Sequence, residues 1–345
     1  MHSISEGIRQ ILHSKRIAII CHINADADAI CSCMALKLLI NKRSEKKHEK
    51  PQIDIFSDTD KLADIYLPIV SHLALNKQRF KKYDLAISLD CPNVYRLGRF
   101  KEIFTNAKDT LMIDHHDTCE NFARNNILRI VSSVCEILYS EFILKRNWKA
   151  CDEAYRLLYS GIITDTNDLT SNTYNSTHHV IADLMEKDAK LNLSLESIRD
   201  HFFKNTTKQK MLLFQRALQS LAFFENDQIA IMKIFKQDLI ETGCKQDDTM
   251  GIVDYALKMK GVKIGIIFIK QEDNSYYVSL RSKDKINVSQ IAKSFGGGGH
   301  YNVSAFQSKE PLADLKQQLI NLCKQQLDNA NLQNDEFNKL FTMDI

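Results

Sequence analysis

Short apolar runs alternate with helix-period segments along the first half of the chain. Four runs have the length of buried strands, at residues 17–21, 53–56, 85–89 and 110–113. After the first of them, residues 29–40 place Ile30, Met34 and Leu38 four positions apart, which is typical of one face of a helix. This alternation of strand and helix predicts an α/β fold with a parallel sheet.

The second half of the chain changes from helical to strand-rich. Residues 175–203 and 211–223 keep a helical spacing, and strand-like segments return at 229–234, 262–269 and 276–280, before a polar helix over 311–329. We therefore predict a first domain over residues 1–187, a helical linker over 188–222 and a smaller α+β domain over 223–345. The charged stretch 41–50 is predicted to be a solvated loop that closes the first helix.

Composition narrows the class of protein. The 345 residues are 44% hydrophobic and 26% charged, as in globular proteins. The apolar run 17–21 is far shorter than the roughly 20 residues of a membrane-spanning helix, and the first residues lack the pattern of a signal peptide, so we expect a cytoplasmic protein without a membrane partner. Nine cysteines without a CxxC pair indicate reduced, packed thiols. A net charge of +3 is too small to mark a nucleic-acid binder, so local features must hold any anionic partner.

Acidic and imidazole side chains follow the predicted strands, where α/β sheets bind their ligands. A single Asp after a strand is most often a helix cap, and a His pair is most often structural. An ordinary fold does not need so many of these groups at successive strand ends. The candidates are His22, Asp26, Asp28, Asp90, Asp114, His115, His116 and, after the apolar segment 157–164, Asp165.

Such a cluster points to a bound cation. Neighbouring carboxylates repel and raise one another's pKa unless a cation neutralises them. A mixed set of His and carboxylate ligands without Cys suits Mn²⁺, Mg²⁺, Co²⁺ or Zn²⁺ better than a thiol-loving metal. Because there are enough carboxylates for two ions, the residues favour a binuclear centre.

At this point the motifs resemble a known family, the DHH phosphoesterases. The family takes its name from the triplet found here as Asp114-His115-His116, and its first motif, His-x-Asn-x-Asp-x-Asp-Ala-x-x-Ser, matches residues 22–32. Its second motif, an Asp that closes a strand, corresponds to Asp90, and its fourth, Asp-Thr after a Gly-containing strand or helix, corresponds to Asp165-Thr166. Near the C-terminus, residues 279–282 and 296–300 resemble the DHH-associated domain of the oligoribonuclease and pAp phosphatase branch, the NrnA type. The resemblance implies a Rossmann-like DHH domain and the smaller α+β domain across a cleft.

The resemblance also implies roles for the site residues. One metal ion would be bound by His22, Asp26 and Asp90, and a second by Asp28, Asp90, His115 and Asp165, so that Asp90 bridges the two. His116 would lie beside the substrate phosphate as a charge stabiliser or proton donor, and Asp114 would orient the imidazoles. The ions, about 3.5–4 Å apart, would share a water and activate it for in-line attack on phosphorus.

A second group of residues would bind substrate. The run Gly296, Gly297, Gly298 and Gly299, followed by His300, could present backbone amides to an anion, and Arg281 could grip a phosphate with its fork of donors. The run lacks the Lys-Ser/Thr of a nucleotide triphosphatase loop. Residues 300–306 and Asn167 depart from the family's usual small residues, which affects substrate contacts rather than metal ligation.

The expected activity is therefore that of a hydrolase with two Mn²⁺ ions, for which Mg²⁺ or Co²⁺ could substitute. Its substrates would be short RNA or DNA oligonucleotides (nanoRNA), linear dinucleotides such as pApA in cyclic-dinucleotide turnover, and pAp, with a homodimer as one possible assembly. The alternatives are a RecJ-like single-strand exonuclease, a type II inorganic pyrophosphatase and a catalytically silent nucleotide sensor. RecJ relatives carry an extra OB-type domain and a basic channel, for which this chain has little room. The pyrophosphatases lack the glycine-run domain, and a sensor has no need of both metals.

Overall fold

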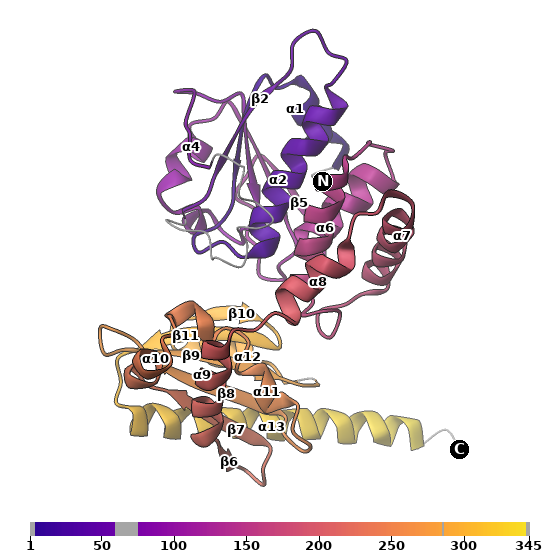
Figure 1. Cartoon of the computed structure of the whole chain (residues 1–345). Coiled ribbons are helices and arrows are strands. Elements are labelled where there is room, and N and C mark those ends of the chain that lie inside the picture. The colour runs from indigo at the N-terminus through magenta and orange to yellow at the C-terminus, as the bar shows by residue number, and fades with distance from the viewer. Residues whose placement is uncertain (1–3, 59–74, 285, 343–345) are drawn as a thin grey trace. The chain divides into compact units, whose positions relative to one another are not determined.

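A computed structural model describes residues 4–58, 75–284 and 286–342, and of residues 300 and 331–342 it describes the backbone alone. The chain divides into two compact units, residues 1–205 and 206–345 (Figure 1). The helices that cover most of the predicted linker fall on either side of this division: α8 (Leu195–Phe203) belongs to the first unit and α9 (Lys208–Gln219) to the second.

The first unit is built on a five-stranded parallel sheet. Its strands are β1 (Arg16–Ile20), β2 (Gln52–Phe56), β3 (Leu85–Leu89), β4 (Asp109–Asp114) and β5 (Asn125–Leu128), in the order β2-β1-β3-β4-β5. The four strands predicted from apolar runs are confirmed, and with them the α/β class. The edge strand β5 was missed because it begins with two asparagines instead of an apolar run.

Helices cover both faces of this sheet. The elements are α1 (Ile4–His13), α2 (Ala27–Arg43), the 3₁₀ helix η1 (Val94–Phe100), α4 (Lys101–Thr105), α5 (Val134–Leu138), the π-helix η2 (Tyr139–Leu144), α6 (Asp152–Asp165), α7 (Asn175–Leu191) and α8. The larger core joins the Ile17, Ile19 and Ile87 face of the sheet to α2, α5 and α6, while a smaller core joins the Ala18 and Ile20 face to η1 and α4. Helices α2 and α6 pack directly against each other (Figure 1).

For two segments the structure decides what the hydrophobic pattern left open. The apolar segment 157–164, whose pattern fits either a strand or a helix, lies in α6, so that Asp165 is the last residue of a helix. The long helical segment 175–203 consists of α7 and α8, which are separated where Asn192 and Ser194 adopt left-handed conformations. His178 and His179 are exposed in the first turns of α7.

The second unit contains a mixed sheet between two helical layers. Its strands are β6 (Ala222–Phe224), β7 (Ile229–Ile234), β8 (Ile264–Lys270), β9 (Tyr276–Ser282), β10 (Gly298–His300) and β11 (Val303–Ser308), in the order β10-β11-β9-β8-β7-β6, antiparallel except between β7 and β8. The helices are α9, α10 (Lys236–Thr242), the 3₁₀ helix η3 (Gln246–Thr249), α11 (Asp254–Leu257), α12 (Val288–Ser294) and α13 (Leu312–Thr342). Helices α12 and α13 share a core with one face of the sheet, and α9 and α11 share a core with the other. The α+β expectation is confirmed.

Across the described ranges, no helix has both the length and the apolar character needed to cross a bilayer.

Candidate metal centre

The predicted metal ligands converge where the strand order of the first sheet reverses. From β1 the sheet continues to β2 on one side and to β3 on the other. A reversal of this kind leaves a crevice outside the carboxyl ends of the strands, which is the usual ligand position in open α/β sheets. His22 follows β1, Asp90 follows β3, and Asp114 ends β4, so the sheet brings these side chains to one edge.

His22, Asp26 and Asp90 form one group of potential ligands, with donor atoms that lie within 4.8 Å of one another. Nε2 of His22 is 3.6 Å from Oδ2 of Asp90 and 3.9 Å from Oδ2 of Asp26. Asp26 is the N-cap of α2, because its Oδ1 accepts a hydrogen bond from the amide of Ala29 at 3.0 Å. The cap fixes the Asp26 side chain and leaves its second oxygen directed toward His22.

Asp28, His115 and Asp165 form a second group, and Asp90, His115 and His116 form a third that overlaps both. Nε2 of His115 lies 3.4 Å from Oδ1 of Asp90 and 3.4 Å from Oδ2 of Asp165. The two oxygens of Asp90 therefore face different histidines, Oδ2 toward His22 and Oδ1 toward His115. This is the arrangement that a carboxylate bridging two ions requires.

Backbone carbonyls orient the two histidines. Nδ1 of His115 lies 3.1 Å from the carbonyl oxygen of Val131, and Nδ1 of His22 lies 2.7 Å from that of Ile23. A carbonyl can only accept, so in the neutral imidazoles the proton sits on Nδ1 and Nε2 presents its lone pair to the centre. Nη2 of Arg96 is 3.1 Å from the same nitrogen of His22, but the shorter contact with the carbonyl decides the tautomer.

Asp28 is fixed by the start of α5. Its side chain is buried, and its two oxygens accept hydrogen bonds from the amides of Val134 at 2.7 Å and Cys135 at 3.0 Å. Amide donors at the start of a helix favour a carboxylate there. Asp28 therefore enters the centre from α2 in an orientation that α5 determines.

Within the third group, His116 is paired with Asp114, which belongs to none of the three. Oδ1 of Asp114 accepts hydrogen bonds from both the backbone amide and Nδ1 of His116, each at 2.7 Å. His116 is 21% exposed at its side chain, whereas His115 is only 4% exposed. The triplet thus supplies one buried imidazole at the centre and one accessible imidazole whose orientation Asp114 determines.

The carboxylates and imidazoles of this cluster strongly shift one another's pKa. Burial and the charge of Asp90 raise the pKa of Asp28 to about 7, and burial also raises the pKa of Asp165. Burial disfavours the charged form of both His22 and His115, yet the neighbouring carboxylates, with Asp90 first, raise the pKa of His22 to about 10 and that of His115 well above its usual range. The same histidines outweigh burial and hold the pKa of Asp90 well below its ordinary value. In the metal-free protein, imidazole protons therefore offset the carboxylate charge.

The residues present fit divalent metal ions. Oδ1 of Asp90 and Oδ2 of Asp165 are buried and have no hydrogen-bond partner among the described residues. Buried carboxylate oxygens without a donor are costly, and a metal ion would satisfy both. The donor set of imidazole nitrogens and carboxylate oxygens is the set that suits Mn²⁺, Mg²⁺ or Zn²⁺. All six sequence-predicted ligands lie in the groups described above.

Sequence reasoning missed the segment that holds two of these ligands. The carbonyl of Val131 contacts His115, and the amides of Val134 and Cys135 contact Asp28. Glu136, fully buried, accepts hydrogen bonds from the backbone and side chain of Ser132, and Ser133 caps α5. The detectable signal was Ser-x-x-Glu before an apolar run, which is the pattern of a capping box.

Gly161 allows the close approach of α6 to α2. A Cβ at this position would lie 2.6 Å from Oδ1 of Asp28 and 2.3 Å from Sγ of Cys135. Only glycine leaves room for both neighbours, and the resulting approach brings Asp165, one turn later in α6, to the centre.

The predicted substrate residues lie in the second unit, and several have local partners. Nε of Arg281 donates to Oδ1 of Asp254 at 2.8 Å, and its Nη1 donates to Oγ of Ser279 at 3.0 Å. The amides of Gly296 and Gly297 donate to carbonyls of α12, so these two amides of the run close a helix instead of facing an anion. Gly298 and Gly299 lie in β10, which His300 ends; the side chain of His300 lies outside the described part of the structure.

Strand β11 approaches the run so closely that glycine is required at one position whether or not a ligand binds there. A Cβ on Gly297 would lie 2.3 Å from the carbonyl oxygen of Ala305 and 2.4 Å from Cβ of Phe306. Packing of the hairpin is therefore sufficient reason for glycine at this position.

Comparisons with known proteins agree with this arrangement. The model of the DHH family N-terminal domain matches residues 16–162, and that of the DHHA1 domain matches residues 226–329. The fold is similar to that of an exopolyphosphatase-related protein from Bacteroides fragilis, with a TM-score of 0.79 and 19% identity over 97% of either chain.

Two curated relatives extend over nearly the same length. The probable bifunctional oligoribonuclease and PAP phosphatase NrnA of Streptococcus mutans is 28% identical over 310 residues, 88% of this chain and 93% of the relative. The bifunctional oligoribonuclease and PAP phosphatase NrnA of Mycoplasma genitalium is 27% identical over 319 residues, 91% and 95% of the two chains. The resemblance found in the motifs is confirmed: the chain belongs to the DHH family and carries a DHHA1 domain after its DHH domain.

Proposed function

We propose that this chain is a phosphoesterase, dependent on two Mn²⁺ ions, that hydrolyses short oligonucleotides, linear dinucleotides such as pApA, and pAp. The observation that carries the proposal is the set of three overlapping His and carboxylate groups at the switch point of the sheet, joined through Asp90 and His115. A bridging carboxylate between two imidazole-bearing groups suits a pair of ions that act on one phosphate.

The ions, when bound, would activate the attacking water and neutralise charge on the phosphoryl oxygens. His22, Asp26 and Asp90 are proposed to hold one of them, and Asp28, Asp90, His115 and Asp165 the other. His116 is proposed to touch the substrate: its side chain is 21% exposed and Asp114 orients its ring through Nδ1, so Nε2 is the nitrogen proposed to donate a proton or stabilise charge on the phosphate.

The relatives support the substrate class. The two curated proteins that match nearly the full length of this chain are named for oligoribonuclease and PAP phosphatase activities. Both matches extend over nearly the full length of this chain, so they include the second domain, in which Arg281 and the glycine run are proposed to bind a substrate phosphate. Asp254 would then keep the guanidinium of Arg281 in place for that contact.

Product analysis tests the proposal. Purified protein would be incubated with Mn²⁺, Mg²⁺ or Co²⁺ and with pAp, pApA, cyclic di-AMP, a 5-mer RNA and a 24-mer RNA. We expect hydrolysis of the short linear substrates with Mn²⁺, loss of turnover with Asp90→Ala, and near-normal turnover with His178→Ala, a matched change of an exposed histidine. A fully active Asp90→Ala protein would refute the binuclear assignment.

Length and salt dependence separate this activity from that of a long-strand exonuclease. Each phosphate neutralised on a single strand adds about −0.7 to the slope of log K against log salt. Because the net charge is only +3, we expect a shallow slope and a preference for substrates of about two to five nucleotides. A steep slope with equal or better kcat/KM on the 24-mer would favour the RecJ-like alternative.

A further inference from the structure

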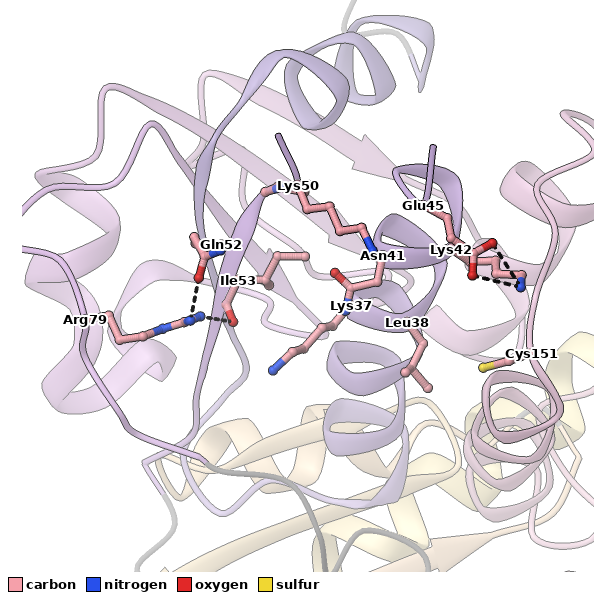
Figure 2. A pocket seen from close by; sticks show the side chains of 11 residues that line it. Lys37, Leu38, Asn41, Lys42, Glu45, Lys50, Gln52, Ile53, Arg79 and Cys151 are labelled. Carbon is pink, nitrogen blue, oxygen red and sulfur yellow. Dashed lines mark hydrogen bonds and ion pairs between the residues drawn. The ribbon is translucent and has the colours of Figure 1, made fainter. Parts of the chain in front are cut away.

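A cavity of about 550 Å³ lies away from the metal centre, at the start of the edge strand of the first sheet (Figure 2). Gln52 and Ile53, the first residues of β2, form one side, and the second half of α2 forms another. The metal centre follows the last residues of the parallel strands, so the cavity and the centre lie at opposite ends of the sheet. Its volume is in the range of small-molecule sites.

The lining of the cavity is cationic. It contains Lys37, Lys42, Lys50 and Arg79, with Glu45 as its only acidic residue. Lys42 is paired with Glu45 at 3.2 Å. Among the residues that the structure describes, Lys37 and Lys50 have no carboxylate partner. Two ammonium groups therefore remain available to an anion.

Arg79 adds a fixed positive charge. Its Nη1 donates to Oε1 of Gln52 and its Nη2 to the carbonyl oxygen of Ile53, each at 2.8 Å, as Figure 2 shows, while its Nε pairs with buried Asp54. Lys37 is half-buried, and burial together with the charge of Arg79 lowers its pKa. Asp54, which pairs with Arg79, acts on Lys37 in the opposite direction but does not outweigh these two effects, and an anion bound beside Lys37 would favour its charged form.

The remaining lining is neutral. Leu38 supplies apolar surface next to the buried Ile53, and Asn41 and Gln52 supply amides. A site for inorganic phosphate alone would need only the cationic residues. A phosphate attached to an organic group would use the cationic residues for the phosphate and the neutral residues for the organic group.

We propose that this cavity is a second ligand site, which binds a nucleoside monophosphate through its phosphate. Lys37 and Lys50 contact the phosphate beside Arg79, and the nucleoside packs against Leu38 and Ile53 within reach of the amides of Asn41 and Gln52. The proposed hydrolysis would release ligands of this class, but binding here does not depend on that activity.

The test combines calorimetry with a local probe on the full-length, metal-loaded protein. 5′-AMP, inorganic phosphate and adenosine would be titrated by isothermal calorimetry, and hydrogen–deuterium exchange would be followed in peptides covering residues 37–53 and 76–82. We expect 5′-AMP to protect these peptides and adenosine to leave them unchanged. We expect phosphate to bind more weakly than 5′-AMP.

Neutral substitutions locate the site. Lys37→Gln should lower the affinity of the site for 5′-AMP at least about tenfold, the loss expected for one charge-assisted hydrogen bond, and should remove the protection. Lys50→Gln, at an exposed position, is a second variant that does not threaten the fold. Lys77→Gln is the matched control, because Lys77 lies in the same basic segment but outside the lining. Hydrolysis of pApA should be unchanged in all three.

Three outcomes would overturn the proposal. The first is protection by 5′-AMP confined to peptides of the metal centre. The second is equal affinity in the wild type and in both lining variants. The third is an equal loss of affinity for 5′-AMP in Lys77→Gln, which would indicate that the general positive charge of this surface attracts the anion and that no specific site exists. Because these readouts concern binding, an inactive wild-type protein that still shows the protection would refute the proposed hydrolysis and leave this site standing.

Discussion

Glu136 offers a direct way to perturb the metal centre without touching a ligand. This fully buried carboxylate accepts three hydrogen bonds on Oε2: from the amide of Ser132 at 3.1 Å, from Oγ of Ser132 at 2.6 Å and from Oγ1 of Thr177 at 2.7 Å. We predict that Glu136→Gln weakens metal binding although residue 136 contacts no proposed ligand side chain.

The expected losses of stability and metal affinity follow from the segment that the Glu136 carboxylate fixes by hydrogen bonds. Val131 and Val134, on either side of Ser132, supply a carbonyl to His115 and an amide to Asp28, so movement of the segment shifts two ligands at once. A hydrogen bond to a charged group contributes about 1.5–3 kcal/mol and a neutral one about 0.5–1.5 kcal/mol. With three bonds losing charge assistance and a neutral amide easier to bury, we expect a loss of about 1–3 kcal/mol in stability. Loss of an outer partner of metal ligands typically lowers metal affinity about 10- to 100-fold, and the conservative change should lie near tenfold.

The assay needs a control that separates positioning from general destabilisation. Glu141 is also buried, but its close partners are Lys145 and Arg146, each at 2.7 Å, and Arg129, which precedes the ligand-holding segment, is 4.0 Å away, so Glu141→Gln should cost stability and largely keep metal affinity. Mn²⁺ affinity would be measured by calorimetry and stability by thermal unfolding in the presence of a chelator. Wild-type affinity in Glu136→Gln, or an equal loss of affinity in both variants, would show that the positioning argument is wrong.

Three further predictions concern the same centre. Gly161→Ala should lower both stability, by about 1–3 kcal/mol as in other overpacked cores, and Mn²⁺ affinity, since its Cβ would reach Asp28; unchanged thermal unfolding would contradict the packing argument. His116→Ala should retain both ions in elemental analysis yet lose much of kcat, and a missing ion would instead make His116 a ligand. In the metal-free protein the raised pKa of His22, about 10, contributes stability that is fully present below about pH 6.5 and is lost as pH rises toward 10. Melting temperature should therefore fall over that interval with chelator and fall less with Mn²⁺, whose binding has already displaced the proton; parallel curves would count against this linkage.

The fold of the first domain was predictable because its apolar strand runs are each followed by the polar residues of a family motif. Strands β1 to β4 are apolar runs buried on both faces, as in parallel sheets covered by helices, and each ligand motif directly follows a strand or, for Asp165, ends a helix. Strand β5 begins with asparagines, so nothing in its first half marks it as apolar. The supporting contacts of residues 131–136 are made by backbone atoms, and a backbone carbonyl or amide leaves no residue-specific signal.

The second domain shows why a glycine run is ambiguous. The same residue type serves an anion cradle, a helix end and a tight strand contact. Here Gly296 and Gly297 donate their amides to α12, and Gly297 also fits under β11. The short elements α10, α11 and β10 were not predicted, since three to seven residues are too few for a hydrophobic period to show. The phosphate contact of Arg281 stays a prediction, and its partner Asp254 is too distant in sequence to be inferred from a motif.

The placement of the ligands implies that metal binding stabilises the whole first domain. His22 and Asp28 come from the start of the chain, Asp90 and His115 from the middle of the sheet, and Asp165 from the end of α6. Ions bound by all five would connect β1, α2, β3, β4 and α6 at one point, where the metal-free protein has mutually repelling carboxylates. A ligand that binds only the folded state adds about 2.7 kcal/mol at a concentration 100 times its Kd. Because the proposed ligands come from five separate elements, this gain should apply to those elements together and not to one of them alone.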